Sequence, residues 1–114
     1  MASTAGIVGI SMEALASAEL SYIAADGTQF DLRIAVGRPY RAAGGEWRCP
    51  VAIEGLERPL PDMAGEDSLQ AMCMALSIVR GLLEHFVEQG GRLFHRDGRT
   101  PFDVDATFGR IARP

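Results

Sequence analysis

The sequence predicts one α+β domain: an antiparallel β-meander of three strands, one long helix packed on one sheet face, then a fourth strand and a candidate fifth. Three observations predict it. Apolar and polar residues alternate over 19–36 and 47–53, Asp-Gly and Gly-Gly dipeptides separate these stretches, and apolar residues recur at helical spacing over 67–89. A chain of 114 residues is one domain long. We assign 19–114 to a single compact α+β domain and 1–18, rich in Ala, Gly and Ser, to a flexible or arm-like N-terminal segment.

The strand order follows from one dipeptide and one proline. Asp26-Gly27 favours the tight turn of a hairpin, so the first two strands are expected to be neighbours. Pro50 lies inside the third strand, over 47–53, and cannot donate to a neighbouring strand. The third strand is therefore expected at a sheet edge or at a bulge, with the fourth strand beside the first, in the order 3-2-1-4. The segment 56–66 is expected to be an irregular connection.

The long helix is expected to begin at Asp67 and to end at Gly90-Gly91. The Asp67 carboxylate can accept from the backbone N–H of Gln70, while the Gln70 side chain reaches back toward the start of the helix. The fourth strand is expected over 92–96. Phe102 and Val104 alternate with aspartates over 102–105, and this pattern fits a fifth strand.

Composition excludes several functional classes. The net charge is −4, which argues against nucleic acid or an anionic membrane as the partner. The chain contains no Lys, which excludes a Schiff-base lysine and a P-loop lysine. No apolar run approaches the roughly 18 residues that read as a membrane-spanning helix. Cys49 and Cys73 are too few for a disulfide framework and fit a reducing compartment, so we expect a cytoplasmic protein.

Two segments carry a resemblance to a known family. Residues 47–56 read W-x-C-P-V-x-I-x-G-L, and residues 67–76 read D-S-L-Q-A-x3-A-L; Gly90-Gly91-Arg92-Leu93-Phe94 follows them. In this order they resemble a family of small uncharacterised bacterial proteins, a domain of unknown function, over roughly residues 20–105. The resemblance implies a short bacterial protein and supplies no activity, catalytic residue or cofactor.

The cysteines are the first candidate nucleophiles. Cys49 shares an alternating stripe with Trp47, Val51 and Ile53, where a thiol behaves as a small apolar side chain. A reactive thiol needs a nearby base or cation, and Arg48 points to the opposite face of the strand. We therefore expect Cys49 to lie in the core. We expect the same of Cys73, which lies on the apolar side of the helix.

A second candidate site combines the two histidines with two carboxylates. His85 and His95 flank the Gly90-Gly91 turn, and with Asp103 or Asp105 they could form a two-His, one-carboxylate metal site. Their spacing matches no recognised ligand motif. We therefore expect no catalytic residues, no metal and no cofactor, and keep Cys49 and these four residues as an alternative site.

The helix has an apolar arc wider than one sheet can cover. Met74, Ile78 and Leu82 recur at i, i+4 and i+8 on a face that the sheet is not expected to reach. We expect them to be covered by the chain's own arms or by another protein, and a second copy is favoured because symmetric dimers are common. This face is the candidate interaction surface.

These observations favour a small cytosolic, non-catalytic protein that acts through protein–protein contact with itself or with another protein. An immunity- or antitoxin-type role fits the size and the acidic charge, because an acidic surface complements a basic toxin. The alternative is a small enzyme or ligand-binding protein that uses Cys49 or the His85, His95, Asp103 and Asp105 group. The two are distinguished by whether these side chains line one open pocket.

Overall fold

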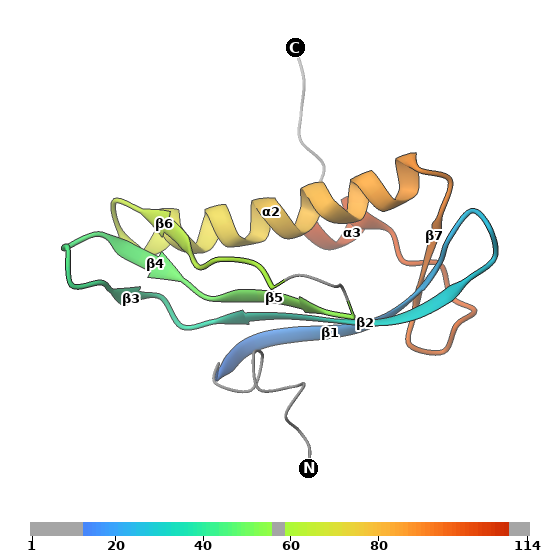
Figure 1. Cartoon of the computed structure of the whole chain (residues 1–114), viewed down its shortest axis with the longest axis horizontal. Helices are drawn as coiled ribbons and strands as arrows, with labels where there is room; N and C mark the ends of the chain where they lie inside the picture. Colours follow the sequence, from blue (N-terminus) through green and yellow to red (C-terminus); the bar gives the residue numbers. More distant parts are fainter. Residues whose placement is uncertain (1–12, 56–58, 110–114) are drawn as a thin grey trace.

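Helix α2 lies across two antiparallel sheets, as the computed structural model in Figure 1 shows for residues 13–55 and 59–109. The strands are β1 (Ala14–Ile23), β2 (Gln29–Gly37), β3 (Tyr40–Arg41), β4 (Trp47–Cys49), β5 (Val51–Glu54), β6 (Met63–Gly65) and β7 (Arg92–His95). The helices are α2 (Ser68–Glu88) and α3 (Val104–Phe108). The larger sheet has the order β5-β2-β1-β7, and the smaller sheet has the order β3-β4-β6.

The order of the larger sheet confirms the predicted 3-2-1-4 arrangement. β1 and β2 form the expected hairpin around Asp26-Gly27, with Ile23 opposite Gln29. β5, the second half of the predicted third strand, forms one edge, and β7 pairs with β1 at the other. The fold is therefore the expected α+β class, with strands before and after the long helix.

Pro50 divides the predicted third strand between the two sheets. β4 ends at Cys49 and pairs with β3 and β6, while β5 begins at Val51 and pairs with β2. The Pro50 carbonyl still accepts from the Gly37 N–H at 2.9 Å. A residue without an N–H cannot continue the ladder, so the chain leaves one sheet and enters the other at this point. Part of the segment predicted to be irregular, 56–66, also forms a strand, because β6 supplies an edge of the smaller sheet.

Two boundaries differ from the sequence-based expectation. β1 begins at Ala14, so the sheet starts within the segment 1–18 that was expected to be arm-like; residues 1–12 lie outside the described residues. No strand forms over 102–105. Instead the Asp103 carboxylate accepts from the Ala106 N–H at 3.2 Å and caps α3, because an aspartate at this position favours a helix start over a ladder.

The core lies between α2 and the two sheets. The helix buries one residue per turn along a single row, Ala71, Ala75, Val79 and Leu83, each with no exposed area. The sheets contribute the inward residues Leu20, Leu32, Ile34, Val36, Cys49, Val51, Ile53 and Leu93. Near the C-terminal end of α2, Phe86 stacks on Tyr22 of β1 with ring centroids 4.9 Å apart. The alanines bring the helix backbone close to the smaller sheet.

We predict that Gly65→Ala lowers the free energy of unfolding by about 1–3 kcal/mol, a typical cost of overpacking. A Cβ at Gly65 would lie 2.8 Å from the Ala71 Cα and would also overlap the Ala71 backbone nitrogen, which cannot move away as a flexible side chain could. The matched control is Gly81→Ala, because a Cβ on this helical glycine meets no atom within 4 Å. The control is expected to gain about 0.5–1 kcal/mol. Urea denaturation measures both, and equal changes would contradict the close packing.

Candidate functional site

The start of α2 is fixed by the predicted capping residues. The Asp67 carboxylate accepts from the Gln70 N–H at 2.7 Å. The Gln70 side-chain oxygen accepts from the Glu66 N–H, also at 2.7 Å. These contacts satisfy donors that the first turn would otherwise leave without a partner. The first turns of α2 are therefore held rigidly over the smaller sheet.

One face of these first turns is apolar and exposed. Leu69, Cys73 and Leu76 recur at i, i+4 and i+7, so they lie on the same side of the helix. Leu69 is 71% exposed and Leu76 is 39% exposed, and Cys73 is exposed as well. We call these three residues the apolar stripe. Within the described residues, no helix is long and apolar enough to cross a membrane.

The face predicted from the wide apolar arc is only partly open. Ile78 and Leu82 are half-buried and pack against the core of their own chain, whereas Met74 is 43% exposed. The expectation that the sheet does not reach this face assumed a single sheet beneath the helix. α2 also packs extensively on β4 and β6 of the smaller sheet, so a second sheet lies beneath it. The prediction for Cys73 is wrong for a related reason, because its side of the helix faces away from both sheets.

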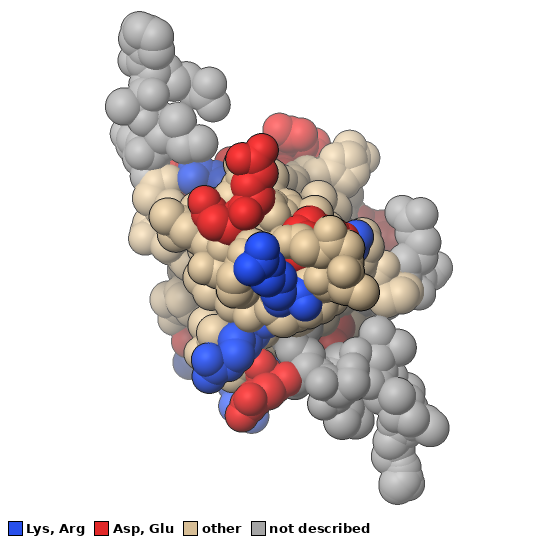
Figure 2. Space-filling model, turned by 90° about the vertical axis from the view of Figure 1, so that its left-hand side faces the viewer, with Lys and Arg blue, Asp and Glu red and all other residues tan. Residues whose placement is uncertain are grey.

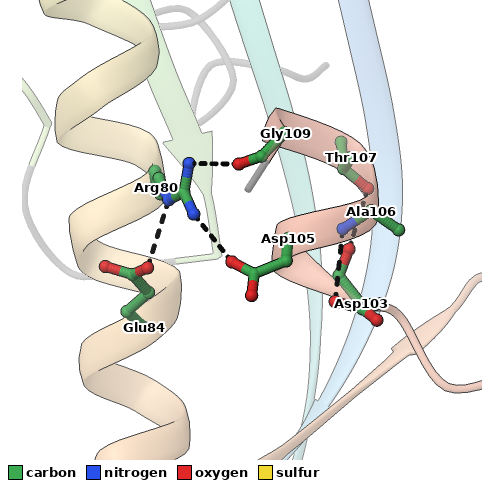
Figure 3. Close-up of polar contacts among 7 residues, drawn as sticks. All are labelled: Arg80, Glu84, Asp103, Asp105, Ala106, Thr107 and Gly109. Carbon is green, nitrogen blue, oxygen red and sulfur yellow. Dashed lines mark hydrogen bonds and ion pairs between the residues drawn. The ribbon is translucent and has the colours of Figure 1, made fainter. Parts of the chain in front are cut away.

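Arg80 holds α3 against the middle of α2 (Figure 3). Its guanidinium donates to the Gly109 carbonyl and to the Asp105 carboxylate, both at 2.7 Å, and to Glu84 at 3.1 Å. The Arg80 side chain is only 15% exposed, which makes this the most enclosed of the ion pairs between described residues. Sequence reasoning missed this contact, because only the Arg80–Glu84 spacing at i and i+4 is visible along the chain.

Cys49 lies in the core, as predicted. Its side chain has no exposed area, and its thiol lies 3.5 Å from the Gly37 carbonyl and 3.7 Å from the Pro50 carbonyl. Burial, and to a smaller degree the charge of Asp62, raises the pKa of this thiol. A thiol that is buried and protonated is a poor nucleophile. These properties favour a structural role for Cys49.

The other members of the alternative site lie on separate elements. His85 is exposed on α2, and His95 is exposed at the end of β7, where its ring packs edge-on against Phe102. Asp103 caps α3, and Asp105 binds Arg80. In the described part of the chain, no three His, Cys, Asp or Glu side chains lie close enough together to hold a metal ion.

Asp97 is the remaining carboxylate near these histidines, and it is engaged within its own turn. The Thr100 hydroxyl donates to it at 2.6 Å, and the backbone N–H groups of Thr100 and Arg99 donate at 2.8 Å. These hydrogen bonds, that of the Thr100 hydroxyl first, lower the pKa of Asp97 to about 2. Its role is to fix the turn after β7.

The sheet face opposite α2 is charged and shallow. An open hollow of about 480 Å³ is lined by Glu19, Leu20, Asp31, Leu32, Arg33, Glu54, Gly55 and Arg96. Arg33 pairs with Glu54 at 3.4 Å, and Arg96 pairs with Glu19 at 2.9 Å. Figure 2, which shows the end formed by the smaller sheet, also has acidic and basic side chains interspersed. Neither of these two surfaces carries charges of a single sign, which would attract a ligand of the opposite charge.

We predict that Cys49 resists alkylation in the native protein, because its thiol is enclosed and its pKa is raised. The test uses a Cys73→Ser variant, so that Cys49 is the only thiol. Iodoacetamide should label it only after denaturation. Rapid stoichiometric labelling of the folded variant would contradict its place in the core.

We predict that Arg80→Met lowers the free energy of unfolding by about 1–3 kcal/mol, since hydrogen bonds to charged groups contribute on this scale. The backbone amides of α3 should also exchange faster with solvent, because the contact to Asp105 and Gly109 is lost. Glu84→Gln is the matched control and should change stability by less than about 0.5 kcal/mol. Hydrogen exchange by NMR measures the effect, and unchanged protection of α3 would show that apolar packing alone holds it.

Comparisons with known proteins give a family for this chain and no activity. No curated protein matches the chain, and no solved structure matches it. A family model described as "Domain of unknown function (DUF6968)" matches residues 16–104, which include both sheets and α2. The match thus begins inside β1 and ends at the start of α3. The chain belongs to this family of unknown function.

Proposed function

We propose that the chain is a cytoplasmic, non-catalytic protein that acts through protein–protein contact, and that the apolar stripe of α2 is its contact surface. One observation carries the proposal. Leu69 is 71% exposed and lies in the hydrogen-bonded first turn of α2, and Cys73 and Leu76 lie on the same face of the helix. A contiguous apolar surface on an ordered helix costs free energy in water unless a partner covers it.

The chemistry of the remaining side chains supports a contact role over an enzymatic one. Cys49 is enclosed and its pKa is raised, which disfavours the thiolate. Asp103 and Asp105 are committed to capping α3 and to binding Arg80. Three of the five residues that an enzyme or ligand-binding alternative would use, Cys49, Asp103 and Asp105, are thus engaged in the fold. Cys49 and Cys73 are both free thiols, as expected for a reducing compartment.

An immunity- or antitoxin-type role is the narrower form of this proposal. The net charge of −4 suits a basic partner, since opposite charges speed association and favour the right partner. The identity of the protein that meets the apolar stripe decides between this role and self-association.

We predict that a photo-crosslinking amino acid at Leu69 captures one discrete protein in the cells that naturally produce this chain. The side chain projects from the stripe into solvent, so a partner that covers the stripe lies within reach of the probe. Mass spectrometry then identifies the captured protein. The matched control carries the same probe at His85, which is exposed on the opposite side of α2.

The captured protein should also bind the purified wild-type chain and should bind a Leu69→Glu variant at least tenfold more weakly. The same products from Leu69 and His85, or none from Leu69, would contradict the proposed contact surface. An unchanged melting temperature of Leu69→Glu shows that the loss of binding is local, as its high exposure leads us to expect.

A further inference from the structure

Strand β1 is paired along both of its edges over only four of its ten residues. β2 pairs with β1 from Ala14 to Ile23, with a shift of register between Ala14 and Ala16, whereas β7 pairs only with Leu20–Ile23. Among the described residues, Ala14–Glu19 therefore has a neighbour on the β2 side alone, and we call this segment the free edge of β1. An unpaired edge presents backbone donors and acceptors that a strand from another molecule can meet.

The hydrogen-bond pattern shows which backbone groups point out of this edge. The Ala24 N–H donates to Thr28, toward the β2 side, at 2.8 Å, and this direction alternates along an antiparallel strand. The N–H and C=O groups of Ser17 and Glu19 consequently point toward the free edge. The N–H directions in β7 follow the same alternation. His95 lies opposite Leu20, and its backbone N–H donates to the Thr100 carbonyl on the side of β7 away from β1.

The side chains of the free edge do not oppose pairing. The run Ala14-Leu15-Ala16-Ser17-Ala18 has no proline and no charge, and most of its side chains are very small. Proteins usually protect an open edge with proline, lysine or other charges. The one charged residue of the segment, Glu19, is paired with Arg96 at 2.9 Å.

The apolar stripe lies on the same side of the molecule as this edge. Arg80 follows Leu76 by one turn, and it binds α3. α3 itself comes after β7, the neighbour of β1, and the intervening Phe102 N–H donates to Leu93 at 2.9 Å. Figure 3 shows α3 beside α2 on the side of β1. The helix face that carries the stripe is therefore turned toward the β1 side of the larger sheet.

We infer that a second copy of this chain pairs with the free edge of β1, strand against antiparallel strand, about a two-fold axis perpendicular to the sheet near Ser17. This inference rests on the proposed function and names the partner at the same surface. This two-fold rotation joins the larger sheets of the two copies into one continuous sheet and places both α2 helices on the same face of that sheet. One symmetric contact then covers the free edge and the apolar stripe of both copies.

The chemistry of the edge selects a second copy as the occupant. A two-fold axis places the segment against itself, so the partner strand has the same length, the same small side chains and no charge between Ala14 and Ala18. Like charges facing each other would oppose such a pair, and here none meet. The apolar stripes approach each other under the same operation, so each provides the apolar surface that the other needs.

The test compares three variants with the wild-type chain by sedimentation equilibrium. Ser17→Pro removes an N–H group that points out of the free edge. Because the substitution breaks no hydrogen bond with β2, the monomer should keep its fold. Leu76→Glu places a charge in the apolar stripe. Val87→Glu is the matched control, because Val87 is also exposed and apolar on α2 but lies beyond Arg80 and α3.

The wild type should be a dimer, and Ser17→Pro and Leu76→Glu should each raise its Kd at least tenfold, whereas Val87→Glu should not change it. In the wild type, the alkylation rate of Cys73 should also fall as the protein concentration rises, because the stripe becomes covered. A monomeric wild type, or a dimer that tolerates both substitutions, overturns the inference. If Ser17→Pro does not fold, Leu76→Glu and the Cys73 rate still decide it.

The two proposals can fail separately. A monomer whose Leu69 probe captures a different protein would leave the contact function standing and would remove the second copy as the partner. A Leu69 probe that captures nothing, together with a dimer sensitive to Ser17→Pro but not to Leu76→Glu, would overturn the stripe as a contact surface.

Discussion

The structure depends on the close approach of one helix to two sheets. α2 meets the smaller sheet through Ala71 and the larger sheet through residues farther along the same row, such as Leu83. The approach at Gly65 leaves no space for even one methyl group. A helix that buries small residues lets its backbone come near the strands, and the contact then excludes water along its whole length. Both sheets are consequently positioned by the same row of side chains.

This arrangement requires the chain to change sheets, and Pro50 is where it does so. β4 and β5 are adjacent in sequence, yet they pair with different neighbours. Cys49 lies immediately before this break and fills the core with no exposed area. A thiol is small enough for this crowded site and only weakly polar, and its one S–H can donate to the Gly37 carbonyl at 3.5 Å or to the Pro50 carbonyl at 3.7 Å.

The apolar surface of α2 is left open where no sheet and no other helix packs on it. Ile78 packs against the core on one flank, and α3 is held by Arg80 against the middle of the other. The first turns on that second flank, which carry Leu69 and Leu76, have neither cover among the described residues. Because β7 is short, the neighbouring half of β1 lacks a strand on its outer side as well. The exposed face of α2 and the unpaired part of β1 have one origin, because neither β7 nor α3 extends over this end of the molecule.

The sequence by itself determined the elements whose signals are local. Asp26-Gly27 set the first hairpin, Asp67 set the start of α2, and Pro50 set the point where the predicted third strand is interrupted, because turn, cap and missing-donor effects act between near neighbours. The strand order followed from these. At 102–105, however, alternation predicted a strand where the Asp103 cap starts a helix, as two local signals competed and the cap won.

Only the tertiary structure decided which apolar residues of α2 are exposed. Helical spacing marks Leu69, Cys73 and Ile78 alike as apolar, but burial depends on what lies opposite each flank. Ile78 packs against the core, and the Arg80 contact joins residues 25 to 29 positions apart. Such contacts form only once the chain has folded back on itself, so no periodicity along the sequence can encode which flank stays open.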